Sequence, residues 1–169
     1  MYDIYSNAQN DKWRFTLGKS AKGKLLTIGL NPSTATQEKA DVTVAKVEVA
    51  ARSNGFEGFV MLNLYPVRST DYRLLPRVPN RKAFQANLER IEAVVASESE
   101  PVIWAAWGAS IAYHSYFIEA RDTLFERLGR YKVKWLRFGE LTAGGHPRHP
   151  SRLSYDWKFA PYVLTKGTP

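Results

Sequence analysis

Residues 144–157 (GGHPRHPSRLSYDW) combine two histidines, two arginines and two serines with two prolines. Prolines at this spacing interrupt helices and paired strands, so we expect a loop. An imidazole can exchange a proton near neutral pH, and a guanidinium group can bind phosphate. A zinc site is disfavoured, because His146 and His149 do not share a helix face and no third ligand is evident.

The segments before this loop alternate between short apolar runs and amphipathic stretches. The four expected strands are 24–30, 59–64, 102–107 and 132–138. Three helices are expected, and the first covers residues 38–53. The second is capped by Asn80 and has an apolar face made of Phe84, Leu88, Ile91 and Val95. The third follows Gly108 and buries Tyr113, Phe117, Ala120, Leu124 and Leu128. We therefore expect a three-layer α/β/α sandwich with a mostly parallel, four-stranded central sheet, in a single domain over residues 1–169.

Polar or aromatic residues follow each expected strand. The segment 31–33 (Asn-Pro-Ser) follows the first strand, Asn63 ends the second, Trp107 ends the third, and the histidine loop follows the fourth. In open α/β sheets the ligand crevice lies beyond the carboxyl ends of the strands, so we expect these residues to meet there. Taken singly, each also has a purely structural interpretation, because Asn, Pro, Gly and Ser are common in turns and at strand ends.

Taken in order, "TIGLNPST", "VMLNLYP", "VIWAAWGASIA" and "HPSRLS" resemble the uracil-DNA glycosylase superfamily over residues 25–154, within a motif-bearing core of 24–157. That superfamily has a Gly-x-(Asp/Asn)-Pro motif after its first strand and a His-Pro-Ser motif near its end. Within it the chain is most similar to a bacterial and phage domain family with a Gly-Leu-Asn-Pro-Ser-Thr signature. The resemblance implies hydrolysis of an N-glycosidic bond in DNA, which releases a base and leaves an abasic site.

The resemblance also implies roles for two catalytic residues. His149 matches the histidine that donates a hydrogen bond to the pyrimidine O2, which a neutral imidazole can do. Asn31 stands where the most active branch has an aspartate, so it would orient the attacking water without accepting a proton. Glu38 and Asp41 are the nearest carboxylates in the sequence, and nothing in the sequence places either beside Asn31.

The base itself would be recognised by neighbouring residues. Asn63 matches the asparagine that reads the Watson–Crick edge of a flipped base. Ser33 replaces a tyrosine that excludes a 5-methyl group, so we expect a pocket that tolerates 5-substituted pyrimidines. The other expected substrate-binding residues are Leu30, Pro32, Tyr65 and Trp107.

The segment Ser151-Arg152-Leu153-Ser154 matches the loop that pinches the DNA backbone. Leu153 would be the wedge that fills the space vacated by the flipped base. Arg148 and Arg68 are further expected DNA contacts, and Arg68 belongs to a loop that also contains Arg73, Arg77 and Arg81. If these arginines meet phosphates, binding should weaken steeply with salt.

Composition sets further bounds. The chain has 169 residues, no cysteine and a net charge of +8, which favours a polyanionic partner such as DNA bound through a basic face. Without cysteine there are no disulfides, thiolate nucleophiles or Cys-held iron–sulfur clusters, which fits a cytoplasmic protein. No segment is apolar enough for a membrane span. We expect a monomer that needs no cofactor or metal, and no strand cleavage, because the two motifs lack a Schiff-base lysine.

Two other functions remain open at this point. The chain is a non-catalytic nucleic-acid binder if Asn31 no longer supports hydrolysis. It is an N-glycoside hydrolase or transferase for free nucleotides if the same crevice works without base flipping.

Overall fold

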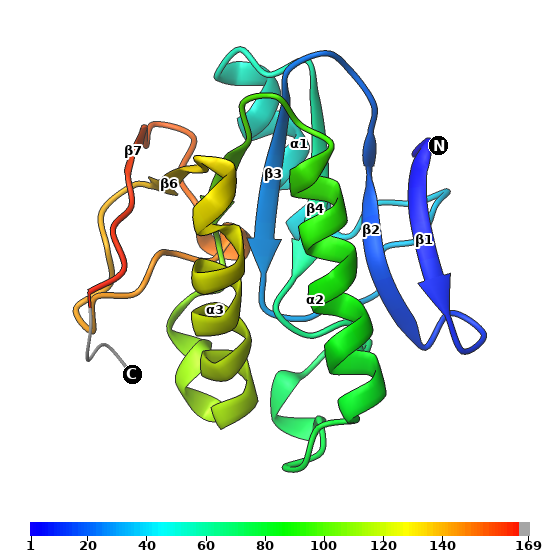
Figure 1. The fold of residues 1–169 in the computed structure, drawn as a ribbon. Helices are drawn as coiled ribbons and strands as arrows, with labels where there is room; N and C mark the ends of the chain where they lie inside the picture. The colour runs from blue at the N-terminus through cyan, green and yellow to red at the C-terminus, as the bar shows by residue number, and fades with distance from the viewer. Residues whose placement is uncertain (166–169) are drawn as a thin grey trace.

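The computed structural model describes residues 1–165, which form one mixed sheet with helices on both faces (Figure 1). The strands are β1 (Ile4–Ala8), β2 (Trp13–Lys19), β3 (Lys24–Gly29), β4 (Gly58–Asn63), β5 (Val102–Ala105), β6 (Lys134–Phe138) and β7 (Phe159–Pro161). Their order across the sheet is β1-β2-β4-β3-β5-β6-β7. The chain is therefore an α/β protein.

The middle of the sheet contains the four strands that the sequence predicts. Strands β4, β3, β5 and β6 lie side by side and run parallel. β3 pairs with β4 from Lys24 opposite Gly58 to Gly29 opposite Asn63, so these two strands end together. Both strands are almost wholly buried, as expected for parallel strands that are covered on two faces.

The prediction of a four-stranded sheet is wrong, because three antiparallel strands extend it at its edges. β1 and β2 continue the sheet beyond β4, and β7 pairs with β6 at the opposite edge. β1 (IYSNA) is half polar and β7 has only three residues. Short, partly polar edge strands lack the apolar run by which a buried strand is identified.

Helix α1 (Val42–Ser53) covers one face of the sheet, and α2 (Arg81–Ala96) and α3 (Ser115–Leu128) cover the other (Figure 1). Side chains alternate between the two faces along each strand, so neighbouring residues join different clusters. Leu26 and Ile28 pack with residues of α2 and α3, whereas Leu25 packs with residues of α1. No helix within residues 1–165 is long and apolar enough to cross a bilayer.

Capping side chains define where two helices begin. Asn80 Oδ1 accepts a hydrogen bond from the Ala83 N–H at 3.0 Å, which confirms the predicted start of α2. Asp41 Oδ1 accepts from the Val44 N–H at 2.9 Å, so α1 begins after Asp41 and not at residue 38 as predicted. Residues 30–41 therefore form a long loop above the end of β3.

Candidate active site

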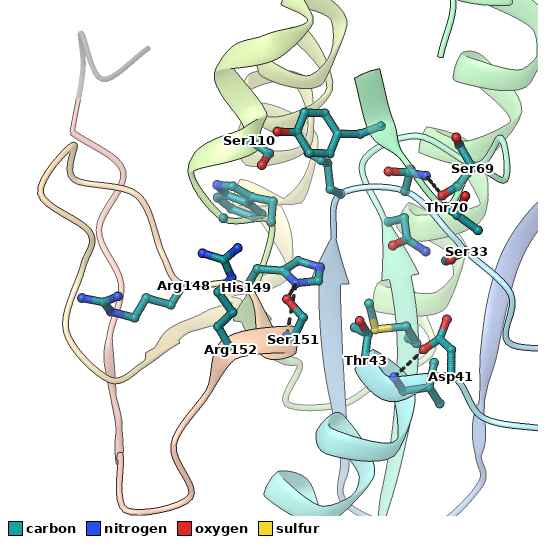
Figure 2. A pocket seen from close by; sticks show the side chains of 18 of the residues that line it. Ser33, Asp41, Thr43, Ser69, Thr70, Ser110, Arg148, His149, Ser151 and Arg152 are labelled. Carbon is teal, nitrogen blue, oxygen red and sulfur yellow. Dashed lines mark hydrogen bonds between the residues drawn. The ribbon is translucent and has the colours of Figure 1, made fainter. Parts of the chain in front are cut away.

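A cavity of about 630 Å³ opens where β3, β4 and β5 end. Figure 2 shows His149, Ser151, Arg148 and Arg152 on one side of it and Ser33, Asp41, Thr43, Ser69 and Thr70 on the other. The predicted site residues among those that line the cavity are Leu30, Asn31, Ser33, Asn63, Trp107, Arg148, His149, Ser151 and Arg152. The structure thus brings together residues that are more than 100 positions apart in the sequence.

Asn63 lies at the carboxyl end of β4, and its residue surface is only 1% exposed. Neither its Oδ1 nor its Nδ2 has a hydrogen-bond partner among the described residues. Nearly all buried polar atoms in proteins are hydrogen-bonded, so an amide with two free atoms on a cavity wall is typical of a ligand-binding group. A Cβ on Gly29 would lie 2.9 Å from Asn63 Oδ1, so a glycine at that position leaves room for the amide.

Asn31 presents its amide in one fixed orientation. Its Nδ2 donates hydrogen bonds to the carbonyl oxygens of Pro32, at 3.0 Å, and Ser69, at 2.9 Å. Both N–H groups of the amide are thereby used, which leaves Oδ1 as an acceptor beside the cavity. This orientation suits an oxygen that holds a water molecule.

His149 is held in one tautomer by the turn that follows it. The backbone N–H of Ser151 donates to Nδ1 at 3.2 Å, and Ser151 Oγ lies 2.8 Å from the same atom. Because Nδ1 accepts, the proton of the neutral imidazole resides on Nε2. Nε2–H is then a hydrogen-bond donor that the turn leaves free.

The surroundings of His149 keep the ring neutral. Burial lowers the pKa of His149 to about 4, and the negative charge of Asp41 opposes part of that shift. The side chain keeps some accessible surface because it lines a cavity, although protein surrounds it on most sides. Gly108, with a φ of 75°, allows this close packing, because a Cβ there would lie 2.9 Å from His149 Cβ.

Asp41 is the carboxylate that lines the cavity within residues 1–165. Its Oδ1 caps α1, and its Oδ2 accepts a hydrogen bond from the Ala35 N–H at 3.3 Å. Glu38, the other carboxylate near Asn31 in the sequence, is exposed and does not line the cavity. The structure therefore distinguishes between two carboxylates that the sequence left equivalent.

The rim of the cavity is basic, and hydrogen bonds to backbone carbonyl oxygens hold it in place. Arg148 donates from Nε to the Glu140 carbonyl at 2.8 Å and lies over the Trp157 ring, whereas Arg152 is exposed. Lys46 Nζ donates to the Ser151 carbonyl at 2.7 Å, which fixes the short 3₁₀ turn η4 (Pro150–Arg152) to α1.

Three expected site residues belong to the interior of the protein. Leu153 is 9% exposed and packs in the cluster under α1, so it is not an apolar wedge in this structure. Tyr65 is 1% exposed, packs against the ring of Tyr116 in a tilted arrangement and accepts from the Asn80 N–H, so it does not reach the cavity. Arg68 pairs with Asp11 and binds backbone carbonyls, so its guanidinium is used inside the fold.

Other expected contacts also lie apart from the cavity. Pro32 is buried, and Ser154 forms a turn with Trp157. Arg73 pairs with Asp71 and Arg81 pairs with Glu119, although both arginines remain exposed. His146 is buried and does not line the cavity; no cluster suited to a metal ion occurs in the part of the chain that the structure describes.

Sequence reasoning missed Arg14, which lies on β2, is 1% exposed and lines the cavity. It also missed the contribution of Ser69, Thr70 and Ser110. The signal for Arg14 was a charged residue between the aromatic residues Trp13 and Phe15 in a strand-like segment. That pattern does not reveal which cavity the side chain faces, because β2 reaches the site only through antiparallel pairing with β4.

A model of the protein family described as "Protein of unknown function (DUF1643)" matches residues 13–151. The matched region contains Arg14, Asn31, Asp41, Asn63 and His149. Curated proteins give no match, and neither do solved structures.

Proposed function

We propose that this chain, which belongs to the DUF1643 family of proteins of unknown function, is a DNA glycosylase that hydrolyses the N-glycosidic bond of a flipped pyrimidine. The motif resemblance to the uracil-DNA glycosylase superfamily supplies the hypothesis. The observation that carries it is the meeting, in one cavity, of an unpartnered buried amide, Asn63, and a neutral imidazole donor, His149.

Asn63 would recognise the base. The Watson–Crick edge of a pyrimidine carries hydrogen-bond donors and acceptors side by side. A carboxamide has one acceptor oxygen and one donor NH2 group, so it can bond to a neighbouring donor and acceptor of the base at the same time. Both amide atoms of Asn63 lack a partner among residues 1–165, so no existing hydrogen bond has to break when a base enters. Ser33 also lines the cavity, and its small side chain would leave space for a substituent at C5.

His149 would stabilise the leaving group. When the bond between C1′ of the sugar and the base nitrogen breaks, the electron pair goes to the base and negative charge develops on its carbonyl oxygens. A donor that already points at this oxygen stabilises the transition state more than the ground state. The neutral Nε2–H of His149 fits this role, because the Ser151 N–H fixes the tautomer.

Asn31 and Asp41 would serve the sugar side of the reaction. The oxygen of a water molecule held by Asn31 Oδ1 bonds to C1′, and the proton that the water loses passes to solvent or to the departing base. The carboxylate of Asp41 would favour the positive charge that develops on the sugar ring. Asn31 cannot take the proton usefully, so we expect a slower reaction than that of enzymes with an aspartate there.

DNA would approach across the basic rim. Arg152 is exposed, Arg148 is partly exposed, and the net charge of +8 favours a polyanion. Because Leu153 is packed in the core, the proposal assigns it no contact with the duplex. Phosphate contacts and the binding of the base in the cavity would offset the cost of flipping.

The test uses duplexes that carry one uracil, one thymine opposite guanine, or one 5-hydroxymethyluracil. Each duplex is incubated with the protein and treated with alkali, and released bases are identified by mass spectrometry. We expect a free base and an alkali-labile break for at least one duplex. His149→Asn keeps an acceptor for the Ser151 N–H and removes the Nε2 donor, so base release should fall about 10²–10³-fold while DNA binding persists.

Binding without base release from every duplex would contradict the proposal and favour a nucleic-acid binder of the same fold. An equal rate for His149→Asn would contradict the role of the imidazole. His149→Gln is the matched comparison, because its amide can place a donor near the position of Nε2 and should restore part of the activity.

A further inference from the structure

Arg14 is a buried cation on the cavity wall. The residue is 1% exposed, its Nη1 donates to the Ala35 carbonyl at 3.2 Å, and its Nε has no partner in the part of the chain that the structure describes. It nevertheless lines the cavity. A buried charged group with unused donors beside an open space is an arrangement that a bound ligand completes.

The charge of Arg14 is not neutralised by an ion pair. Within residues 1–165 no carboxylate lies in salt-bridge distance of it, whereas the neighbouring Arg68 pairs with Asp11 at 3.0 Å. Burial lowers the pKa of Arg14 to about 10, and the positive charge of Arg68 adds to this effect. The negative charge of Asp41 opposes this lowering of the pKa more than that of any other group within residues 1–165. Its two oxygens already accept from the N–H groups of Val44 and Ala35.

The hydrogen-bond partner of Arg14 lies close in the sequence to the residue that would face C5 of the base. Its partner, the Ala35 carbonyl, lies two residues beyond Ser33, where a C5 substituent would fit. The cavity of about 630 Å³ exceeds the needs of a plain base. Even at the ~30 Å³ that one water occupies in the liquid, the eight non-hydrogen atoms of uracil would fill roughly 240 Å³.

We propose that Arg14 forms an anion-binding subsite in this cavity, which takes a carboxylate or phosphate group of the substrate. A guanidinium with free N–H groups binds such anions through charge-assisted hydrogen bonds. This inference rests on the proposed function, because the anionic group would belong to a ligand whose pyrimidine ring is hydrogen-bonded by Asn63. The anion has two possible sources: an acidic substituent at C5 of a base in DNA, or the phosphate of a free nucleotide.

The experiment compares matched neutral and anionic ligands by calorimetry at fixed pH and ionic strength. The pairs are uracil with 5-carboxyuracil, and uridine with uridine 5′-monophosphate; inorganic phosphate is measured alone. We expect the anionic member of one pair to bind about tenfold or more tightly than the neutral member. Arg14→Met should abolish that preference, and Arg90→Met, which removes an exposed arginine that does not line the cavity, should retain it.

Folding of the variants is checked by thermal unfolding. Arg14→Met replaces an unpaired buried charge with an apolar side chain of similar length, so we expect no loss of stability. Arg14→Lys keeps the charge and should keep part of the preference. This second variant preserves the test if the methionine variant unfolds.

The outcomes distinguish between the two possible sources of the anion. They also show whether the anion subsite or the glycosylase proposal has failed. Preference for 5-carboxyuracil places the anion on the base, and preference for uridine 5′-monophosphate indicates a free nucleotide. Equal affinities within both pairs for the unaltered protein, or a preference that survives Arg14→Met, would overturn the subsite. If uracil and uridine do not bind but phosphate binds through Arg14, the subsite stands and the glycosylase proposal loses its base-binding step.

Discussion

The backbone N–H of Ser151, two residues after His149 in the chain, donates a hydrogen bond to Nδ1 of His149 at 3.2 Å. This one contact decides which ring nitrogen carries the proton, and burial keeps the ring from acquiring a second one. The side chain is therefore a donor of fixed direction on the cavity wall.

The free energy of unfolding should fall as the pH is lowered from about 6.5 to about 4. In this range the unfolded chain binds a proton at His149, whereas the folded chain does not, because burial lowers the pKa of His149 to about 4. His149→Asn should reduce the dependence of unfolding free energy on pH by about one proton in that window. Urea unfolding at several pH values measures this. His146, whose pKa burial also lowers, should leave a residual slope of the same sign in the variant. An unchanged slope would contradict the neutral state of His149.

Asp41→Asn should separate charge from helix capping. Asparagine caps a helix as well as aspartate does, so Asp41→Asn keeps the hydrogen bond from the Val44 N–H and loses only the longer one from the Ala35 N–H, at 3.3 Å. The melting temperature should therefore fall less than that of Asp41→Ala. Base release should nevertheless slow, by roughly 10²-fold, because the carboxylate beside the sugar is lost. Asp41→Ala is the control, since it removes the hydrogen bond to the Val44 N–H and should cost about 1 kcal/mol of stability. Unaltered base release by the asparagine variant would remove Asp41 from the mechanism.

Gly29→Ala should displace the Asn63 amide. The added Cβ would lie 2.6 Å from Met61 Cε and 2.9 Å from Asn63 Oδ1, so at least one of these side chains must move. We expect at least a tenfold loss of affinity for a free base, measured by calorimetry. Gly129→Ala is a matched control, because a Cβ there has no neighbour within 4 Å among the described residues. Similar binding by both variants would show that Asn63 does not hold the base.

Arg152→Ala should reduce the slope of log affinity against log salt by about one for duplex DNA. Arg152 is exposed at the rim of the cavity, so its guanidinium is available to a phosphate. Arg81→Ala is the comparison, because Arg81 Nη1 already pairs with Glu119 at 2.7 Å on another part of the surface. Fluorescence anisotropy at several salt concentrations gives both slopes. Equal slopes for the two variants would exclude the rim as the DNA contact.

Strongly periodic segments of the sequence predicted the parts of the fold that they build. The apolar runs of β3 and β4 and the Asn80 cap of α2 were identified because each signal is local. The convergence of residues 31, 63 and 149 also followed from the sequence, since parallel strands end at one edge of a sheet. Edge strands β1 and β7 were missed because their pairing, and not their composition, defines them.

The directions of several side chains at the site could not be predicted, because they depend on contacts between segments that are far apart in the sequence. Asp41 was expected inside a helix, yet it caps that helix and so faces the cavity. Leu153 was expected at the surface, yet the turn at Pro150 directs it into the core. Arg14 reaches the cavity from an antiparallel neighbour of β4. In each case a non-local contact decides which way the side chain points.

The most direct test of the central claim is a crystal structure of the protein soaked with 5-carboxyuracil. We predict that the ring binds in the cavity, with both amide atoms of Asn63 at hydrogen-bond distance from its edge and His149 Nε2 beside a ring carbonyl oxygen. The carboxylate should lie against Arg14. A ring bound elsewhere, or a cavity that stays free of it at saturating concentration, would contradict the assignment of these residues to a flipped pyrimidine.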